Sequence, residues 1–375
     1  MASDKVLQAI GTIDAIGGAQ RQVLAVSAVL DPTRVRSDVA WFLGKGELAA
    51  EFRATGARVA DLSGRVWDPI GVARATAAMV RERYDVVHCH LSRAEIVAGA
   101  AAMLARAAGA PRPALILHKH NEDSWWRGAA LGAVHRALTA RADAVVVQSP
   151  RLADFYADPA LHVSHPSRIV VVPYGIDAAT FRVDPDHRAG ARARIRAGER
   201  WDPAAPIVLV IARIVPQKRL DVLLEAWGTV SREVPAARLL IAGRGELQDE
   251  LARHAPPSVR FAGFRSDIAD LLAASDALAI SSDWEGVPMA MLQAMAAGLP
   301  IVSTAVAGIA DAVTDGKEAL LVPPRDPARL SAALIDTLRD PAAAHRRAIA
   351  AEARVLRDFS IAAAARAWEQ LYARF

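Results

Sequence analysis

The chain has 375 residues, of which 53% are hydrophobic and 23% charged, a composition that indicates a folded protein long enough for two domains. Its single cysteine, Cys89, excludes a disulfide within the chain and favours the reducing cytoplasm. The formal net charge is +4, yet no basic run with interleaved aromatic residues occurs, so a nucleic-acid partner is not expected.

The charged residues are unevenly distributed. Residues 1–182 carry 21 Lys and Arg against 17 Asp and Glu, whereas residues 183–375 carry 24 of each. A basic N-terminal half suits an anionic substrate or an anionic membrane surface, although a solvated surface with a slight excess of charge is equally compatible. No apolar run approaches the ~18 residues of a membrane span. We therefore expect a cytoplasmic protein, with peripheral contact at the inner face of the membrane as one option.

In the first half, apolar runs bounded by turn residues predict strands, and the segments between them predict helices. Residues 23–28 could form a strand, but we assign residues 19–30 to a helix because they follow the Gly17-Gly18 turn. The alanine-rich residues 96–108 predict a helix packed in a core. The expected strands cover residues 6–10, 86–88, 115–117, 144–147 and 169–172.

In the second half, strands again alternate with helices, of which residues 220–230 and 247–255 are examples. Continuous apolar strands that alternate with helices are typical of parallel sheets buried on both faces. The predicted fold class is therefore α/β, with two doubly wound Rossmann-like domains that face each other across a cleft. The expected strands cover residues 207–211, 238–242, 259–262, 277–280, 301–303 and 319–322.

The domain boundaries follow from composition. Residues 183–205 are rich in Arg, Asp and Pro and poor in large apolar residues, which indicates a linker. It separates an N-terminal domain, residues 1–182, from a C-terminal domain, residues 206–355. The last segment, residues 356–375, predicts a final helix. Asp184 and Asp186 form a D-x-D string, but their place in the linker favours a solvated turn over a metal site.

Two features of the first half could carry chemistry. Gly17 and Gly18 follow the first strand and permit close approach of the backbone to a phosphate, although an ordinary tight turn explains them as well. Two strand ends carry histidine pairs at i, i+2, a spacing that could suggest metal ligation. No further cysteine or carboxylate set completes a site, so no metal is predicted. The pairs are His88 with His90 and His118 with His120.

In the second half, Arg213 and Lys218 lie five residues apart between a strand and a helix. Two cations on such a loop can converge on a diphosphate and neutralise the charge that develops on a leaving group. Further along, Glu285 stands beside Gly286 at a strand end, immediately before another helix. A carboxylate there can accept hydrogen bonds from sugar hydroxyls. The N–H groups of Gly286, Val287 and Met289 can donate to phosphate or sugar, unlike Pro288.

These segments resemble the large family four of retaining glycosyltransferases with the GT-B fold. The similarity covers residues 205–330 with several ordered motifs, and it is looser over residues 1–180, where residues 170–181 anchor it. The family has two glutamates separated by seven residues; Glu285 matches the first, whereas Gln293 occupies the second position. Position 174 also departs from the pattern, since Tyr174 stands where asparagine is usual.

The resemblance implies a role for each candidate. Arg213 and Lys218 would bind the donor pyrophosphate, Glu285 the sugar hydroxyls and Gln293 the ribose. The loop at Gly17 and Gly18 would face the donor phosphates and the acceptor. His120 would lie near the donor sugar, with His118 as second choice. Gly243 and Arg265 fall in segments that surround the nucleotide in the family.

The final helix crosses back onto the N-terminal domain in that family. Trp125 and Trp126 could line an acceptor cleft, stack on a sugar or simply pack.

The function implied is transfer of a hexosyl unit, with retention, from a UDP- or GDP-sugar to a glycan, lipid-linked or small-molecule hydroxyl. The nucleotide sugar is a co-substrate, so no cofactor is expected, and Arg213 and Lys218 make transfer independent of metal. Two alternatives remain. Gln293 could mark a sugar-nucleotide-binding protein without catalysis, and a GT-B sugar-nucleotide epimerase would need several acid–base carboxylates beyond Glu285.

Overall fold

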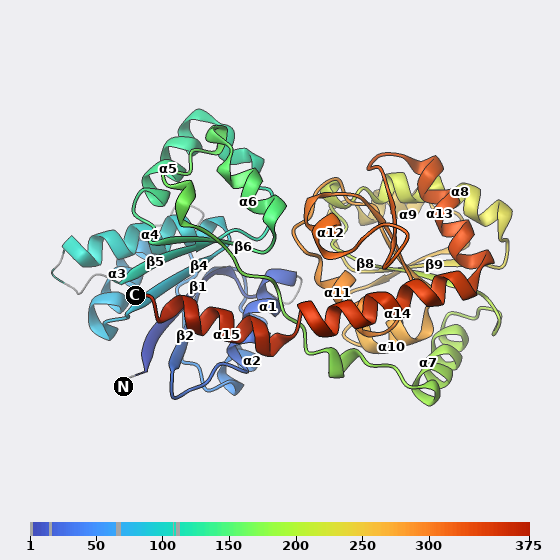
Figure 1. The fold of residues 1–375 in the computed structure, drawn as a ribbon, viewed down its shortest axis with the longest axis horizontal. Helices are drawn as coiled ribbons and strands as arrows, with labels where there is room; N and C mark the ends of the chain where they lie inside the picture. The colour runs from blue at the N-terminus through green and yellow to red at the C-terminus, as the bar shows by residue number, and fades with distance from the viewer. Residues whose placement is uncertain (1–2, 15–16, 65–68, 108, 110–112) are drawn as a thin grey trace. The chain divides into compact units, whose positions relative to one another are not determined.

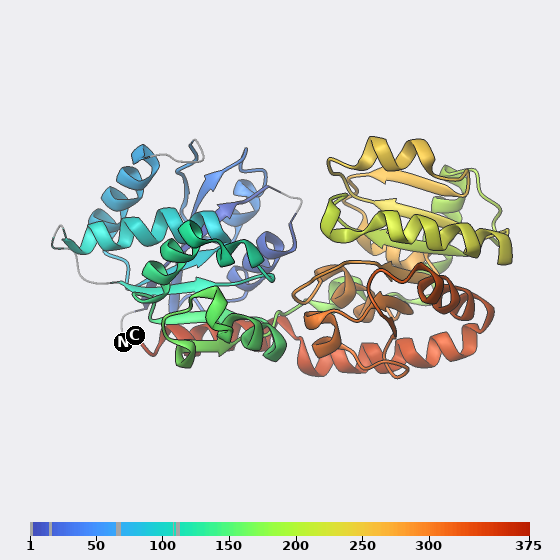
Figure 2. The same cartoon turned by 90° about the horizontal axis from the view of Figure 1, so that it is seen from above.

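A computed structural model describes residues 3–14, 17–64, 69–107, 109 and 113–375. The chain forms two compact units (Figures 1 and 2). The N-terminal unit comprises Met1–Gly175 together with Ile361–Phe375, and the C-terminal unit comprises Ile176–Ser360. Each unit is an α/β layer structure with helices on both faces of one sheet, as the sequence predicts.

The N-terminal unit is built on a seven-stranded parallel sheet in the order β3-β2-β1-β4-β5-β6-β7. Its strands are mostly continuous apolar runs because helices cover both faces. The strands are β1 (Asp4–Thr12), β2 (Val35–Leu43), β3 (Val59–Asp61), β4 (Val86–His90), β5 (Ala114–His118), β6 (Ala144–Val147) and β7 (Ile169–Val171).

Two apolar clusters, one on each face of this sheet, hold its helices in place. One face packs against the alanine-rich α4, and the other packs against α1 and the last helix of the chain, α15. The side chains of Trp368 and Tyr372 on α15 are fully buried in the second cluster. The helices are α1 (Gly18–Ser27), α2 (Ala49–Ala54), α3 (Pro69–Glu82), α4 (Ser92–Ala107), α5 (Ala129–Thr139), α6 (Pro150–Ala157) and α15 (Ile361–Tyr372).

The C-terminal unit has a six-stranded parallel sheet in the order β10-β9-β8-β11-β12-β13. Its strands are β8 (Ile207–Ile211), β9 (Arg238–Ala242), β10 (Val259–Gly263), β11 (Ala277–Ile280), β12 (Ile301–Thr304) and β13 (Leu320–Val322). Its helices are α7 (Pro185–Gly198), α8 (Leu220–Glu233), α9 (Gln248–His254), α10 (Ile268–Ala274), α11 (Met289–Ala296), α12 (Ala307–Ala312), α13 (Pro327–Arg339) and α14 (Pro341–Asp358). The order of β8, β9 and β11 places a topological switch between β8 and β11, where ligands bind in such sheets.

Two strands, β2 and β3, are not predicted by the apolar pattern of the sequence. Polar residues at positions 36–38 interrupt the apolar run of β2, and the buried one, Asp38, depends on tertiary partners. Asp38 is buried and accepts hydrogen bonds from the Tyr84 hydroxyl (3.2 Å) and the Arg58 N–H (3.3 Å). β3 is a three-residue edge strand and is too short for a periodic signal.

The expected linker over residues 183–205 is wrong. These residues form α7 and its flanks, which pack against α10 inside the C-terminal unit. The buried guanidinium of Arg196 donates to the carbonyl oxygens of Ala205 (2.6 and 3.0 Å) and Ala274 (3.0 Å) and so ties this segment to the unit. The polar composition suggested a linker because the sequence alone does not show that a side chain such as Arg196 has hydrogen-bond partners within the unit. The chain instead passes between units at Gly175 and Ile176, and again at Ser360 and Ile361.

Candidate active site

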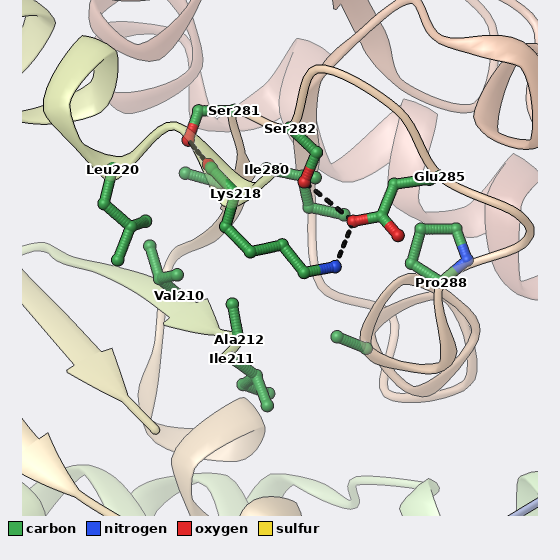
Figure 3. A pocket seen from close by; sticks show the side chains of 12 residues that line it. Val210, Ile211, Ala212, Lys218, Leu220, Ile280, Ser281, Ser282, Glu285 and Pro288 are labelled. Carbon is green, nitrogen blue, oxygen red and sulfur yellow. Dashed lines mark hydrogen bonds and ion pairs between the residues drawn. The ribbon is translucent and has the colours of Figure 1, made fainter. Parts of the chain in front are cut away.

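A pocket in the C-terminal unit lies where β8 and β11 end, at the topological switch (Figure 3). Lys218 and Glu285 point toward each other in it and form an ion pair through Nζ and Oε1. The Ser282 hydroxyl donates to the same carboxylate oxygen (2.7 Å). Both charged side chains are largely buried, with exposed fractions of 16% for Lys218 and 6% for Glu285. Separating a largely buried ion pair costs free energy unless a ligand takes the place of the lost partner.

Main-chain and amide contacts hold the two loops of this pocket together. The Ser281 hydroxyl donates to the Lys218 carbonyl (2.7 Å). Gln217 spans the gap in both directions: its side chain donates to the Trp284 carbonyl (2.7 Å), and its own carbonyl accepts from the Asp283 N–H (3.0 Å). These bonds fix the positions from which Lys218 and Glu285 extend.

Asp283 links a third loop to the same place. Its carboxylate is largely buried and accepts from Arg219 (3.2 and 3.4 Å) and from Arg325 (2.8 and 3.0 Å). The two guanidinium groups hold the pKa of Asp283 below its usual value although burial acts in the opposite direction. Arg219 and Arg325 both have positive φ, 46° and 59°. We call Asp283, Arg219 and Arg325 the Asp283 clamp.

The backbone around Glu285 needs glycine. The Gly308 N–H donates to the Glu285 carbonyl (3.3 Å), and a Cβ on Gly308 would lie 2.0 Å from the Gly286 carbonyl oxygen. Gly286 and Val287 are buried in the turn before α11, and Met289 is the first residue of that helix. Gln293 is half-buried one turn further along α11 and is not among the residues that line the pocket.

The other predicted residues of this unit lie near the strand ends but outside the pocket lining. Arg213 is exposed on the β8 loop, with its guanidinium 3.4 Å from the Gln217 side-chain oxygen. Gly243 has φ of 151°, and a Cβ there would lie 1.8 Å from the Ala212 carbonyl oxygen, so the loops after β8 and β9 touch. Arg265 is engaged in a two-bond pair with Asp267 (2.7 and 2.5 Å).

In the N-terminal unit, Gly17 precedes α1 as its cap and Gly18 is the exposed first residue of the helix. A Cβ on Gly17 would lie 1.8 Å from the side-chain oxygen of Gln20, so a side chain at position 17 would displace Gln20. Trp126 is fully buried and stacks on His135 at 4.5 Å between ring centroids, which decides for packing among its three alternatives. The side chain of Trp125 lies outside the described part of the structure.

The ends of β4 and β5 bring four buried histidines together. His118 and His88 are hydrogen-bonded to each other (3.2 Å), as are His90 and His120 (3.1 Å). Burial lowers the pKa of all four, to about 3 for His120, where the Lys119 charge adds to the effect. They are therefore neutral at physiological pH.

This cluster has partners that the sequence did not suggest. Gln8 on β1 and Tyr372 on α15 contact it, from opposite ends of the chain. Ring nitrogens of His88, His90 and His118 lie within 4.8 Å of one another, a grouping that could hold a metal ion and that the separate i, i+2 pairs did not reveal. Seven of the eight ring nitrogens in the four histidines already share hydrogen bonds, and the eighth is Nε2 of His118. That no metal binds stays a prediction.

Comparison with known proteins agrees with this architecture. Residues 16–180 match the model of Glycosyltransferase Family 4, and residues 205–340 match that of Glycosyl transferases group 1. The chain is 32% identical over 302 residues to the glycogen synthase of Mycobacterium tuberculosis, a match that covers 77% of this chain and 69% of that protein. The chain belongs to glycosyltransferase family 4.

Other relatives of this family-four glycosyltransferase act on different substrates by name. The D-inositol 3-phosphate glycosyltransferase of Kineococcus radiotolerans is 34% identical, covering 57% of this chain and 53% of that protein. The GDP-mannose-dependent alpha-(1-6)-phosphatidylinositol monomannoside mannosyltransferase of Mycolicibacterium smegmatis is 31% identical and covers 64% of each chain. The enzyme class is therefore shared among relatives whose acceptors differ.

Solved structures agree on the fold. Anabaena Alr3699/HepE in complex with UDP-glucose has a TM-score of 0.84 at 20% identity, covering 99% of this chain and 100% of that one. Sucrose-phosphate synthase from Thermosynechococcus elongatus has a TM-score of 0.78 at 20% identity, covering 99% and 98%. The predicted GT-B fold is confirmed. In the described residues, none of the helices of this glycosyltransferase is both long and apolar enough to cross a bilayer.

Proposed function

We propose that this glycosyltransferase transfers a hexosyl unit, with retention of configuration, from a nucleotide-diphosphate sugar to a hydroxyl acceptor. The observation that carries the proposal is the Lys218–Glu285 pair, which sits in a pocket at the switch between β8 and β11. In this pair a cation that would suit a diphosphate lies next to a carboxylate that would suit sugar hydroxyls. The names of two similar proteins support a donor of this kind, one dependent on GDP-mannose and one in complex with UDP-glucose.

Different residues would bind different parts of the donor. Lys218 is already paired with Glu285, so an arriving diphosphate would take over the ammonium charge and release the carboxylate for sugar hydroxyls. Arg213, exposed on the same loop, would provide the second charge. Charges of this kind stabilise a leaving group without a metal. Gln293 would accept from ribose hydroxyls, with weaker bonds than a glutamate would make. His120 would lie near the sugar.

The acceptor we propose is a glycan, a lipid-linked intermediate or a small molecule. The excess of basic residues in positions 1–182 favours an anionic acceptor or an anionic membrane surface. Attraction of this strength would be reversible and sensitive to salt. Flotation with anionic liposomes at low and high salt tests it: no association at low salt removes the membrane from the proposal.

The reaction itself is tested with a panel of UDP-, GDP- and ADP-sugars. Purified protein should hydrolyse one of them slowly and, with an acceptor supplied, form a product whose anomeric configuration, read by proton NMR, equals that of the donor. An inverted product would refute retention. Binding without turnover, or appearance of an epimerised sugar nucleotide, would refute glycosyl transfer in favour of the other two activities.

A further inference from the structure

We propose that Tyr174 is a positioning residue for His120: its hydroxyl donates to Nδ1 and so holds His120 as the Nε2–H tautomer, from which a one-directional series of hydrogen bonds runs on to His118. The functional part rests on the role given to His120 above. Tyr174 stands just after β7 and is buried, with its hydroxyl 2.5 Å from Nδ1 of His120. This is the position where the family usually has asparagine.

The direction of the chain follows from Gln148. Its side-chain nitrogen donates to the Lys119 carbonyl (2.6 Å), which fixes the orientation of the amide. The same nitrogen lies 3.3 Å from Nδ1 of His120 and can only donate. Nδ1 therefore accepts, and the Tyr174 hydroxyl donates to it as well. A neutral imidazole has one N–H, so in His120 the proton is on Nε2.

Each later bond is then determined by the one before it. His120 Nε2–H donates to His90 Nδ1 (3.1 Å), and His90 Nε2–H donates to the Gln8 side-chain oxygen (2.8 Å). The nitrogen of Gln8 donates to the Tyr372 hydroxyl (2.9 Å), which donates to His88 Nδ1 (2.9 Å).

The last bond runs from His88 Nε2–H to His118 Nδ1 (3.2 Å). The chain ends at Nε2 of His118, a buried atom without a partner. No hydrogen bond in this series pairs two donors or two acceptors, which supports a single direction for the whole series.

The consequence for the reaction concerns the freedom of His120. Both of its ring nitrogens are bonded inside the N-terminal unit, and its side chain is 5% exposed. A second fixed partner on Nδ1 leaves the ring one orientation before substrate arrives, as the positioning of a site residue requires.

The first test is spectroscopic and needs no substrate. Protein with ¹⁵N-labelled histidine is examined by long-range ¹H–¹⁵N correlation, with each of the four rings assigned by single substitution. We expect His88, His90, His118 and His120 all in the Nε2–H form. Tyr174→Phe, which deletes only the hydroxyl, should change the Nδ1 shift of His120 and broaden its signals. An Nδ1–H form of His120, or unchanged His120 signals in Tyr174→Phe, overturns the proposal.

The second test is kinetic, with the sugar nucleotide that the wild-type protein turns over. Tyr174→Phe should lower kcat by about 5- to 10-fold with little change in KM, the scale of one lost hydrogen bond. Tyr372→Phe is the matched control: it removes a hydroxyl from the same chain at His88 and should reduce stability without the loss of kcat. Equal losses of kcat in both variants would show a merely structural role. If no sugar nucleotide is turned over, the proposed function fails, while the tautomers still decide the positioning of His120.

Discussion

At the scale of single residues, the proposed function depends most directly on the pair formed by Lys218 and Glu285. The two side chains come from loops 67 positions apart in sequence and meet because β8 and β11 are neighbours in the sheet. Each neutralises the other while no ligand is bound. Removing one partner therefore leaves an uncompensated charge in a largely buried place, besides removing the proposed contact to substrate.

Lys218→Ala and Arg213→Ala should each lower turnover by roughly 10²-fold or more, the usual scale for loss of one charge that stabilises a transition state. Initial rates with the best sugar nucleotide measure the effect, and circular dichroism verifies the fold. Lys317→Ala, at an exposed lysine of the same unit, serves as control and should behave like wild type. Near-normal turnover in both variants would contradict the diphosphate assignment.

Gln293→Glu should tighten nucleotide binding slightly or leave it unchanged, without a change in sugar preference. A carboxylate makes stronger hydrogen bonds to ribose hydroxyls than an amide by about 1 kcal/mol, but its desolvation beside a diphosphate offsets part of the gain. Calorimetric titration with UDP and GDP checks the affinity. An altered sugar preference at equal nucleotide affinity would place residue 293 against the sugar instead.

Turnover should survive EDTA, because in the proposed mechanism Arg213 and Lys218 would supply the positive charge for the diphosphate. The assay compares rates before and after chelation and dialysis. Complete loss of activity that Mg²⁺ or Mn²⁺ restores would refute the expectation and direct attention back to a bound ion.

At the scale of elements, the Asp283 clamp joins the loops that follow β8, β11 and β13. One carboxylate, 8% exposed, receives two guanidinium groups, so the loop that carries Glu285 is tied on both sides. Such loops at the carboxyl ends of parallel strands form the ligand sites of doubly wound sheets. The clamp therefore contributes to the geometry of the pocket without lining it.

Asp283→Asn should reduce stability by about 1–2 kcal/mol, since it removes the charge from a buried carboxylate that accepts four hydrogen bonds. We also expect weaker donor binding. The matched control is Asp221→Asn, because Asp221 pairs with the same Arg219 but is 56% exposed, and exposed pairs contribute little. Urea unfolding and donor titration measure both effects; equal behaviour of the two variants would contradict a role for the clamp.

At the scale of the whole molecule, the two units differ in the kind of polar interaction that they bury. The sheet of the N-terminal unit carries a buried network of histidines beside the chain terminus, whereas the C-terminal unit concentrates ion pairs at its loops. Five histidines of the N-terminal unit are buried and have a lowered pKa: His88, His90, His118, His120 and His135.

The free energy of unfolding should therefore decrease as the pH is lowered below about 6.5, the ordinary pKa of histidine. The unfolded chain binds protons there, while the folded protein does not until the pH approaches the lowered values, about 3 for His120 and His135. Each of these two should cost about 2 kcal/mol of stability at pH 5. Urea unfolding between pH 7.5 and 5 measures the slope. His118→Asn should reduce it and the exposed His345→Gln should not; a flat profile would contradict the prediction.

The sequence by itself determined most of the architecture and supplied the candidate residues for the donor. Continuous apolar runs such as residues 207–211 and 277–280 predicted strands of a parallel sheet correctly, because burial on both faces leaves no other pattern. Lys218 and Glu285 became candidates through their place in strand-end loops and through the family resemblance, and the structure brings the two side chains together. The local sequence was sufficient for predictions that depend only on residues close together in the chain.

Only the tertiary structure decided the features that depend on partners distant in sequence. The polar start of β2 needed Tyr84 and Arg58, and α7 needed the contacts of Arg196. The histidine network needed Gln8 and Tyr372, which are 364 positions apart. A buried polar group is stable only when it is hydrogen-bonded, and which group supplies the bond is set by chain topology, not by neighbours in sequence.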